Sequence, residues 1–300
     1  MAKTAKTKIQ RSVGDHIVDT IIVIIMIFLG IIMLYPMWYE LVVSFSEATQ
    51  LIKQSGVLLW PMGFDTLSYQ LVFNVPHLLN SYKNTLIIVV VGLAVNITMT
   101  SLGAYCLSRT NTKWHRFMTL FVLITMYFNG GLIPTYLTVR GVGLYNTIWA
   151  VIIPVAITTY NMIILRSAFS TIPESLVESV FIDGGGHMTI LFKIFIPLSL
   201  PAMAVQVLYY GVGHWNSWFN AFIYIQDVKQ QPVQLILRKF LISGDNIDFG
   251  ALTANIPNYE MMAKGVKAAM VIVTTLPILA IYPLLQRYFV GGMMIGSLKE

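Results

Sequence analysis

Uncharged and largely apolar runs recur along the whole chain. Crossing a bilayer takes roughly 20 apolar residues, and helices are the expected form because a backbone exposed to lipid must satisfy its own hydrogen bonds. Alternating barrel strands would instead give segments of about 10 residues. The pattern therefore predicts an all-α integral membrane protein. Its six expected transmembrane helices lie at about 17–43, 85–107, 117–137, 146–165, 200–223 and 268–288.

The composition favours a membrane chain over a soluble enzyme. Of the 300 residues, 56% are hydrophobic and 11% are charged, against about 25% charged in an ordinary globular domain. No low-complexity linker separates domains. We expect a cytoplasmic tail at 1–16, one transmembrane domain at 17–290 that includes a cytoplasmic loop at 166–199, and a cytoplasmic tail at 291–300.

Basic residues orient the chain in the membrane. They are denser in the N-terminal tail, in the short loop after the second expected helix, between the fourth and fifth helices, and after the sixth helix. Because cytoplasmic loops carry an excess of Lys and Arg, both termini are expected in the cytoplasm of a multi-pass protein of the cell membrane. The net charge of +6 follows from these flanks and does not indicate a nucleic-acid partner.

Candidate chemistry within the chain is sparse. The single cysteine, Cys106, excludes a disulfide or a thiolate metal cluster within the chain. The five histidines are not spaced as metal ligands, and no catalytic constellation is legible, so neither a metal site nor a catalytic residue is predicted. No Gly-Lys dipeptide occurs, which excludes the P-loop that would bind ATP. Almost no charge lies in the expected spans, which argues against an ion-driven carrier.

The loop at 166–199 has the pattern of two short amphipathic helices. Pro173 can open the first, and Glu174 then lies in the first turn, where the helix dipole favours a carboxylate. Asp183 and Gly184 end this helix, because glycine tolerates a left-handed cap, and the second begins near His187. The expected apolar faces are Leu176, Val177, Val180 and Phe181 on the first helix, and Ile190, Leu191, Ile194 and Phe195 on the second.

Two explanations of these helices remain open on physical grounds. They could rest on lipid headgroups, or they could form a docking element for a soluble partner. The acidic Glu174 and Glu178 favour the partner modestly, because an anionic leaflet repels carboxylates.

The same loop resembles the EAA loop of ABC-importer permeases. The family pattern is E-A-A, three residues, G, nine residues and I-x-L-P. Here Glu178-Ser179-Val180 is followed by Gly184 and then by Ile194-Phe195-Ile196-Pro197 with matching spacing. The departures are Ser179 and Val180 for the two alanines, and Ile196 for leucine.

Further blocks are similar to one branch, the sugar-uptake permeases related to the second permease of the maltose importer. Within that branch they look like the polysaccharide permease group of the LplC and YtcP kind. The resemblance covers most of the chain. Its blocks are Asn129–Thr135, Gly213–Asn220, Asn258–Lys264 and Met294–Lys299.

The resemblance implies one transmembrane subunit of an ATP-driven importer of oligosaccharides or polysaccharide fragments. Family members pair with a second homologous permease, two ATP-binding subunits that carry ATP and Mg, and an extracytoplasmic solute-binding lipoprotein. It also implies that the loop transmits movement from the ATPase, with Glu178 in a polar contact and Gly184 at the turn between the helices. The predicted coupling residues are Leu176, Val177, Glu178, Ser179, Val180, Phe181, Asp183, Gly184, Ile194 and Pro197.

The fifth expected helix carries side chains suited to sugar. Aromatic faces can stack on pyranose CH groups, and amides can bond hydroxyls, while an intramembrane Asn favours a partner or a wet cavity. The alternatives for the aromatic residues are an interfacial belt or packing against the sister subunit. The candidate substrate-path residues are Tyr209, Trp215, Asn216, Trp218, Phe219 and Asn220.

Three other functions are weighed against sugar import. A permease of the same class could carry a peptide or a lipid-linked fragment. An intramembrane enzyme would need clustered polar residues within the spans, and these are missing from the sequence. A secondary carrier would usually have more helices and an internal repeat.

Overall fold

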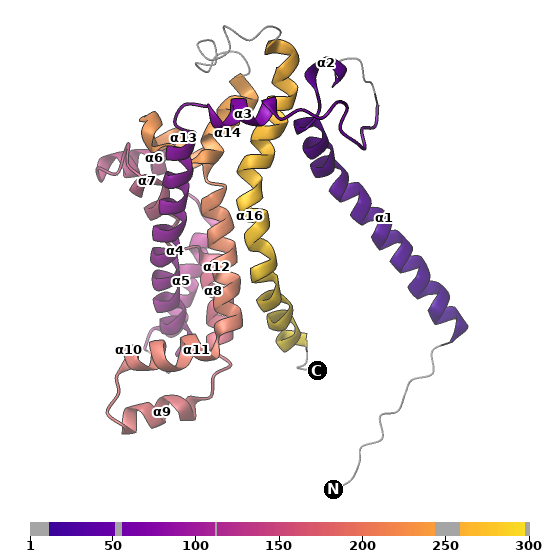
Figure 1. Ribbon diagram of the computed structural model, residues 1–300. Helices are drawn as coiled ribbons and strands as arrows, with labels where there is room; N and C mark the ends of the chain where they lie inside the picture. Colours follow the sequence, from indigo (N-terminus) through magenta and orange to yellow (C-terminus); the bar gives the residue numbers. More distant parts are fainter. Residues whose placement is uncertain (1–11, 52–55, 112, 244–258, 298–300) are drawn as a thin grey trace. The chain divides into compact units, whose positions relative to one another are not determined.

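The computed structural model describes residues 12–51, 56–111, 113–243 and 259–297, and within these ranges it is helical, with one isolated antiparallel bridge between Ser46 and Phe64 (Figure 1). The chain divides into two compact units. The first comprises Met1–Val72 and Ile256–Ile272, and the second comprises Phe73–Asn255 and Val273–Glu300. The all-helical prediction is confirmed for the part of the chain that the structure describes.

The first unit is built around the long helix α1 (Val13–Ser44). A capping box starts this helix, because the Ser12 side chain accepts the Gly14 N–H while Asp15 accepts the Ser12 N–H. Apolar side chains between Ile17 and Leu34 are exposed, as expected of a helix that faces lipid or another subunit. The other elements of this unit are α2 (Ala48–Leu51), α3 (Leu67–Phe73) and the first turns of α16 (Tyr259–Ser297). Its buried apolar cluster consists of Val42, Val43, Leu51, Leu58 and Ala268.

The second unit contains the remaining helices. In chain order they are α4 (Leu78–Ser108), α5 (His115–Tyr127), α6 (Leu132–Gly141), α7 (Trp149–Ile152), the 3-10 turn η1 (Ile153–Val155), α8 (Thr159–Phe169), α9 (Glu174–Ile182), α10 (His187–Ile190), the π-helical turn η2 (Leu191–Phe195), α11 (Ile196–Leu198), α12 (Leu200–Trp215), α13 (Trp218–Tyr224), the 3-10 turn η3 (Val228–Gln230), α14 (Val233–Ser243) and the rest of α16.

Helix α4 is the packing centre of the second unit, where it contacts both α8 and α12 (Figure 1). One of its faces consists mainly of small or polar residues at helical spacing. Such residues let helix backbones approach closely in a membrane protein. The buried members of this face are Ser81, Thr85, Ile88, Gly92, Asn96, Thr100 and Ala104.

Three of the predicted spans are continuous helices. The described residues hold three helices long and apolar enough to cross a membrane, in α1, α4 and α16, or up to six if each of three bent pairs counts as one span. Helix α16 starts at Tyr259 and continues through Ser297, beyond both predicted ends of the sixth span. The family-like block Asn258–Lys264, which precedes the predicted sixth span, therefore lies inside α16. Its first residue, Asn258, falls outside the described residues.

The other three predicted spans are not single straight helices. The segment 117–137 breaks between α5 and α6, which meet at 113°. Gly131 there adopts φ +87°, and the side chain of Asn129 accepts its N–H at 2.9 Å, so the Asn-Gly-Gly sequence forms a turn instead of continuing the helix. The segment 146–165 bends by 51° between η1 and α8. The segment 200–223 is interrupted at Asn216 and Ser217.

Candidate functional site

The loop between α8 and α12 folds as its sequence predicts. Helix α9 begins after Pro173 and ends at Ile182, and α10 begins at His187. Gly184 adopts φ +78°. The Gly185 N–H donates to Val180 O at 2.8 Å, and the Gly184 N–H donates to Phe181 O at 3.0 Å. These two bonds form a Schellman cap, so the predicted role of Gly184 at the turn is confirmed.

Replacing Gly184 with serine is expected to lower the free energy of unfolding by about 1 kcal/mol, because a side chain at positive φ is strained. Denaturant titration of the purified chain in detergent measures this change. The matched control is Gly186→Ser, two residues later, where φ is −100° and the residue caps α10. Serine suits that position, so its effect should stay within about 0.5 kcal/mol. Equal losses at the two positions would contradict the conformational argument.

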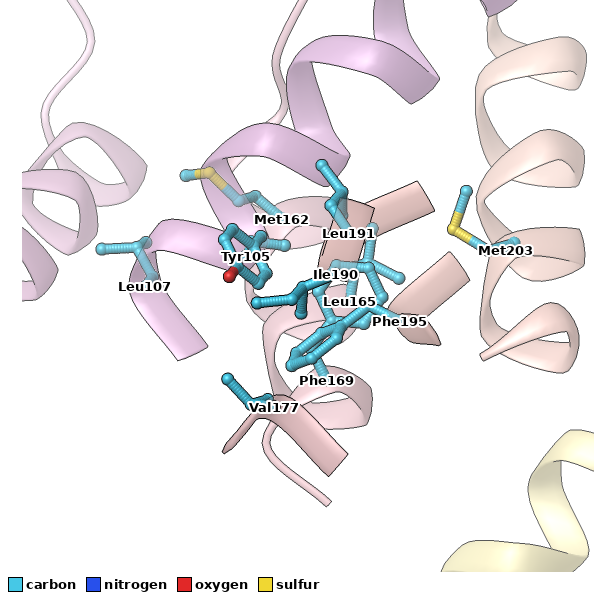
Figure 2. Close-up of a cluster of buried hydrophobic side chains, with 11 residues drawn as sticks. Tyr105, Leu107, Met162, Leu165, Phe169, Val177, Ile190, Leu191, Phe195 and Met203 are labelled. Carbon is cyan, nitrogen blue, oxygen red and sulfur yellow. The ribbon is translucent and has the colours of Figure 1, made fainter. Parts of the chain in front are cut away.

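One face of the loop is buried in the chain's own core, at one end of the second unit. Figure 2 shows Val177 of α9 beside Phe169 of α8, with Ile190 and Phe195 from the following turns in the same cluster. The predicted coupling residue Val177 therefore does not present its side chain to another subunit in this structure, since that side chain is only 2% exposed. It is used instead to hold α9 against the bundle.

Polar contacts fix the same face. Arg109, at the end of α4, forms an ion pair with Glu174 at 2.8 Å, and the Asn111 amide donates to the same carboxylate oxygen at 3.0 Å. The Tyr105 hydroxyl is bonded to His187 Nδ1 at 2.8 Å. Contacts from α4 and the loop after it therefore anchor both short helices.

The loop also carries apolar side chains that the chain leaves exposed. Ile182 is 85% exposed, and Leu176, Phe181 and Met188 are also exposed. Glu178 is exposed on the same helix. Burying such side chains against a partner would be favourable, since each large apolar residue removed from water contributes roughly 1.5–3 kcal/mol.

The remaining predicted coupling residues differ in how far they are buried. Val180 is partly buried, and its side chain lies where a Cβ at Gly185 would clash. Ile194 packs against the buried cluster. The exposed residues of this group are Ser179, Asp183 and Pro197.

A cavity of about 430 Å³ lies at the other candidate site, between the start of α8 and the junction of α12 with α13. Four predicted substrate-path residues line it together: Tyr209, Asn216, Phe219 and Asn220. Its volume falls within the range of about 300–1,000 Å³ that is typical of small-molecule sites. The structure thus brings these four side chains to one hollow.

The two predicted tryptophans do not line this cavity. Trp215 is buried against a separate apolar hollow between α4, α12 and α16. Trp218 carries the Arg238 guanidinium on its ring, with 3.5 Å from Cζ to the ring centroid. At the next position of α14, partial burial lowers the pKa of Lys239. Its ammonium donates to the side-chain oxygen of Gln231 at 2.7 Å. Both tryptophan rings therefore pack against residues of the chain itself, away from the cavity.

Buried polar side chains support the bent helix beside the cavity. The Asn96 amide donates to the carbonyls of Val155 and Ala156, at 2.7 and 3.0 Å. Its oxygen therefore accepts from Nε2 of His214, at 2.6 Å. These bonds satisfy carbonyl groups that the break between η1 and α8 would otherwise leave unpaired, as the membrane interior requires.

A second bridge crosses the same break. The Tyr210 hydroxyl is bonded to Thr100 Oγ1 at 2.8 Å and accepts the Thr158 N–H at 3.1 Å. His214 was not predicted as part of a site. The polar face of α4 was the available signal, because Asn96 and Thr100 lie four residues apart within an apolar span.

Known proteins match this chain over most of its length. No family model matches the chain. Protein LplC of Bacillus subtilis is 38% identical over 274 residues, covering 90% of each chain. The polygalacturonan/rhamnogalacturonan transport system permease protein YtcP of the same organism is 34% identical and covers 95% of this chain and 99% of its own.

A solved structure is similar over nearly the whole fold. In the crystal structure of a bacterial ABC transporter involved in the import of the acidic polysaccharide alginate, one chain superposes with a TM-score of 0.85 at 29% identity. The match covers 93% of this chain and 99% of that chain. With the two sequence relatives, this establishes that the chain belongs to the multi-pass membrane permeases of ABC importers in the carbohydrate-uptake family.

Proposed function

We propose that this chain is the permease subunit of a binding-protein-dependent importer of oligosaccharides or polysaccharide fragments, and that it forms half of the translocation pathway. As a permease of this family it is not itself the enzyme, and ATP hydrolysis belongs to partner subunits. The transport systems named for the relatives, one for pectic polysaccharides and one for alginate, support a saccharide as the substrate.

The two-faced loop formed by α9, α10, η2 and α11 carries the coupling part of the proposal. Its inner face is fixed by packing and by the Arg109–Glu174 pair, so the loop moves as one body with the ends of α4 and α8. Its exposed apolar side chains, Leu176, Phe181 and Ile182, are available to a partner. An ATPase that closes on them can therefore pull directly on the transmembrane helices.

The proposed topology has six spans, with α5–α6 and α7–α8 each counted as one crossing and with both termini in the cytoplasm. The loop at 166–199 is then cytoplasmic, and the segment that includes η3 and α14 is extracytoplasmic. The excess of basic residues on the proposed inner side supports this orientation.

The proposed partners are a second homologous permease, two ATP-binding subunits and an extracytoplasmic solute-binding lipoprotein, with membrane lipid around the spans. ATP and Mg would bind the ATPase subunits. The long exposed apolar surface of α1 is consistent with contact to lipid or to the second permease.

A cysteine crosslink tests the coupling proposal. The native thiol of Cys106 is exposed, so it is first removed as Cys106→Ser. In that background Ile182→Cys is expected to crosslink to the ATPase subunit of the assembled complex, because Ile182 is the most exposed apolar side chain of α9. Gel mobility after treatment with a short bifunctional maleimide gives the readout.

The matched control is Val228→Cys, at an exposed position of η3 in the same unit. It should be labelled by an impermeant maleimide from outside the cell and should give no ATPase crosslink. An assembled complex in which Ile182→Cys stays uncrosslinked, or in which Val228→Cys crosslinks equally well, would refute the assignment of the docking face.

A further inference from the structure

The cavity between α8, α12 and α13 has a lining of restricted chemistry. Tyr209 and Phe219 supply aromatic rings, and Asn216 and Asn220 supply amides. Every residue that lines the cavity lies in the described part of the chain, and none is Lys, Arg, Asp or Glu. The lining can therefore offer stacking faces and neutral hydrogen bonds, but no fixed charge.

The two amides are free to bind a ligand. Within the described residues, the side chains of Asn216 and Asn220 make no hydrogen bond to protein, although both border the cavity. An amide placed beside apolar surface without a partner is unfavourable unless water or a ligand bonds to it. Asn216 is exposed and Asn220 is partly buried, so both amides are open to water and are available to a polar occupant with several donors and acceptors.

The polar groups on the floor of the cavity are already committed. His214, the one imidazole in the lining, is 3% exposed and bonds Asn96 through Nε2. The Tyr210 hydroxyl bonds both Thr100 and the Thr158 N–H. These groups hold the helix break in place, so they do not supply a positive charge for an anionic ligand.

Cations near this end of the unit do not line the cavity either. Arg238 of α14 stacks on the Trp218 ring, and the neighbouring Lys239 donates to Gln231. Carboxylate recognition in proteins generally relies on Arg or Lys, because a carboxylate that loses its hydration without a charged partner is strongly disfavoured.

We propose that this cavity is a saccharide subsite selective for an uncharged pyranose residue over a uronate. The sugar ring stacks on Tyr209 or Phe219, and its hydroxyls bond the amides of Asn216 and Asn220. This inference rests on the proposed function and narrows its substrate class. It sets this chain apart from the importer of the acidic polysaccharide alginate and from the polygalacturonan system of YtcP, although both are similar to it.

A thiol inside the cavity provides the test. Gly213 lines the cavity, and a Cβ built there meets no heavy atom within 4 Å, so Gly213→Cys in the Cys106→Ser background adds a reporter without a clash. The complete complex in lipid nanodiscs is treated with a maleimide, with and without saccharide. The probes are trigalacturonate and its full methyl ester, which share ring and linkage and differ in charge, with maltotriose as a second neutral sugar.

Neutral probes are expected to slow the labelling of Gly213→Cys. Free trigalacturonate should need about tenfold higher concentration to give the same protection from labelling. This factor corresponds to the free energy of one lost charge-assisted hydrogen bond. Adding Asn220→Lys should shift the preference toward the acid. The control Phe222→Lys puts the same charge on α13 at a side chain that is 61% exposed and outside the lining, and should leave the preference unchanged.

The outcomes separate this inference from the proposed function. Equal or better protection by the free acid, or no protection in a complex whose ATPase activity is stimulated by saccharide, overturns the subsite. An unaltered preference in Asn220→Lys overturns it as well. A complex whose ATPase responds to no saccharide, neutral or acidic, overturns the proposed function itself, and the subsite falls with it.

Discussion

Replacing Phe195 with alanine is expected to destabilise the chain by about 3–5 kcal/mol, the usual loss when a buried phenylalanine leaves a cavity. The side chain is 0% exposed. Its ring lies edge-on to those of Tyr105 and Phe169, with centroid distances of 5.0 and 5.3 Å. Because these rings join α4, α8 and the loop, the substitution should also detach the loop from the bundle. Denaturant titration in detergent measures the loss of stability, and ATP consumed per sugar imported measures the loss of coupling.

The control for this prediction lies in the same π-helical turn. Phe192 is 56% exposed, so Phe192→Ala should change the free energy of unfolding by no more than about 0.5 kcal/mol. If the two alanine variants lose the same stability, the buried cluster is not what secures the loop.

Replacing Asn96 with leucine is expected to cost about 2–4 kcal/mol. Leucine has the same branching and the same number of side-chain heavy atoms but cannot hydrogen-bond. It leaves the carbonyls of Val155 and Ala156 and the N–H of His214 without their partner, and each unsatisfied buried group costs about 1–3 kcal/mol before relaxation. The bend between η1 and α8 should loosen as a result. Thermal unfolding of the purified complex measures the first effect, and the labelling rate of a thiol at position 213 measures the second.

Asn84 gives a matched control on the same helix. Its amide also donates to two backbone carbonyls, those of Lys229 and Gln231. The Lys229 contact is exposed, so water can replace the lost donor, and Asn84→Leu should cost less than about 1.5 kcal/mol. A loss at Asn84 equal to that at Asn96 would show that burial is not the reason for the effect.

Local sequence signals predicted the short elements well. Pro173 and Gly184 bound α9 because proline starts a helix readily and glycine accepts positive φ, and both effects act within a few residues. The breaks inside the apolar spans do not show in the hydrophobic pattern. A run of apolar residues indicates only that the segment is stable in lipid. A bent helix meets that condition as well as a straight one when side chains such as Asn96 bond the freed carbonyls.

The direction in which each side chain of the loop points could be known only from the tertiary structure. The spacing of Leu176, Val177, Val180 and Phe181 indicates one apolar face, but it does not say whether that face meets the chain's own bundle or another subunit. In the structure Val177 turns inward to Phe169, while Leu176 and Phe181 stay exposed. The cavity could also be found only from the tertiary structure, because residues of α8 line it together with Tyr209 and Asn220.

Hydrophobic length, charge at the flanks and turn chemistry act over consecutive residues, so they were enough to predict a helical membrane chain with two short helices in one loop. The likeness of that loop to the EAA loop of ABC-importer permeases came from its motif spacing. The folded arrangement was needed to show which apolar side chains hold the loop and which remain for a partner, and which aromatic and amide groups surround a common space. Those properties depend on contacts between helices that are distant along the chain, such as Asn96 with His214 and Arg109 with Glu174.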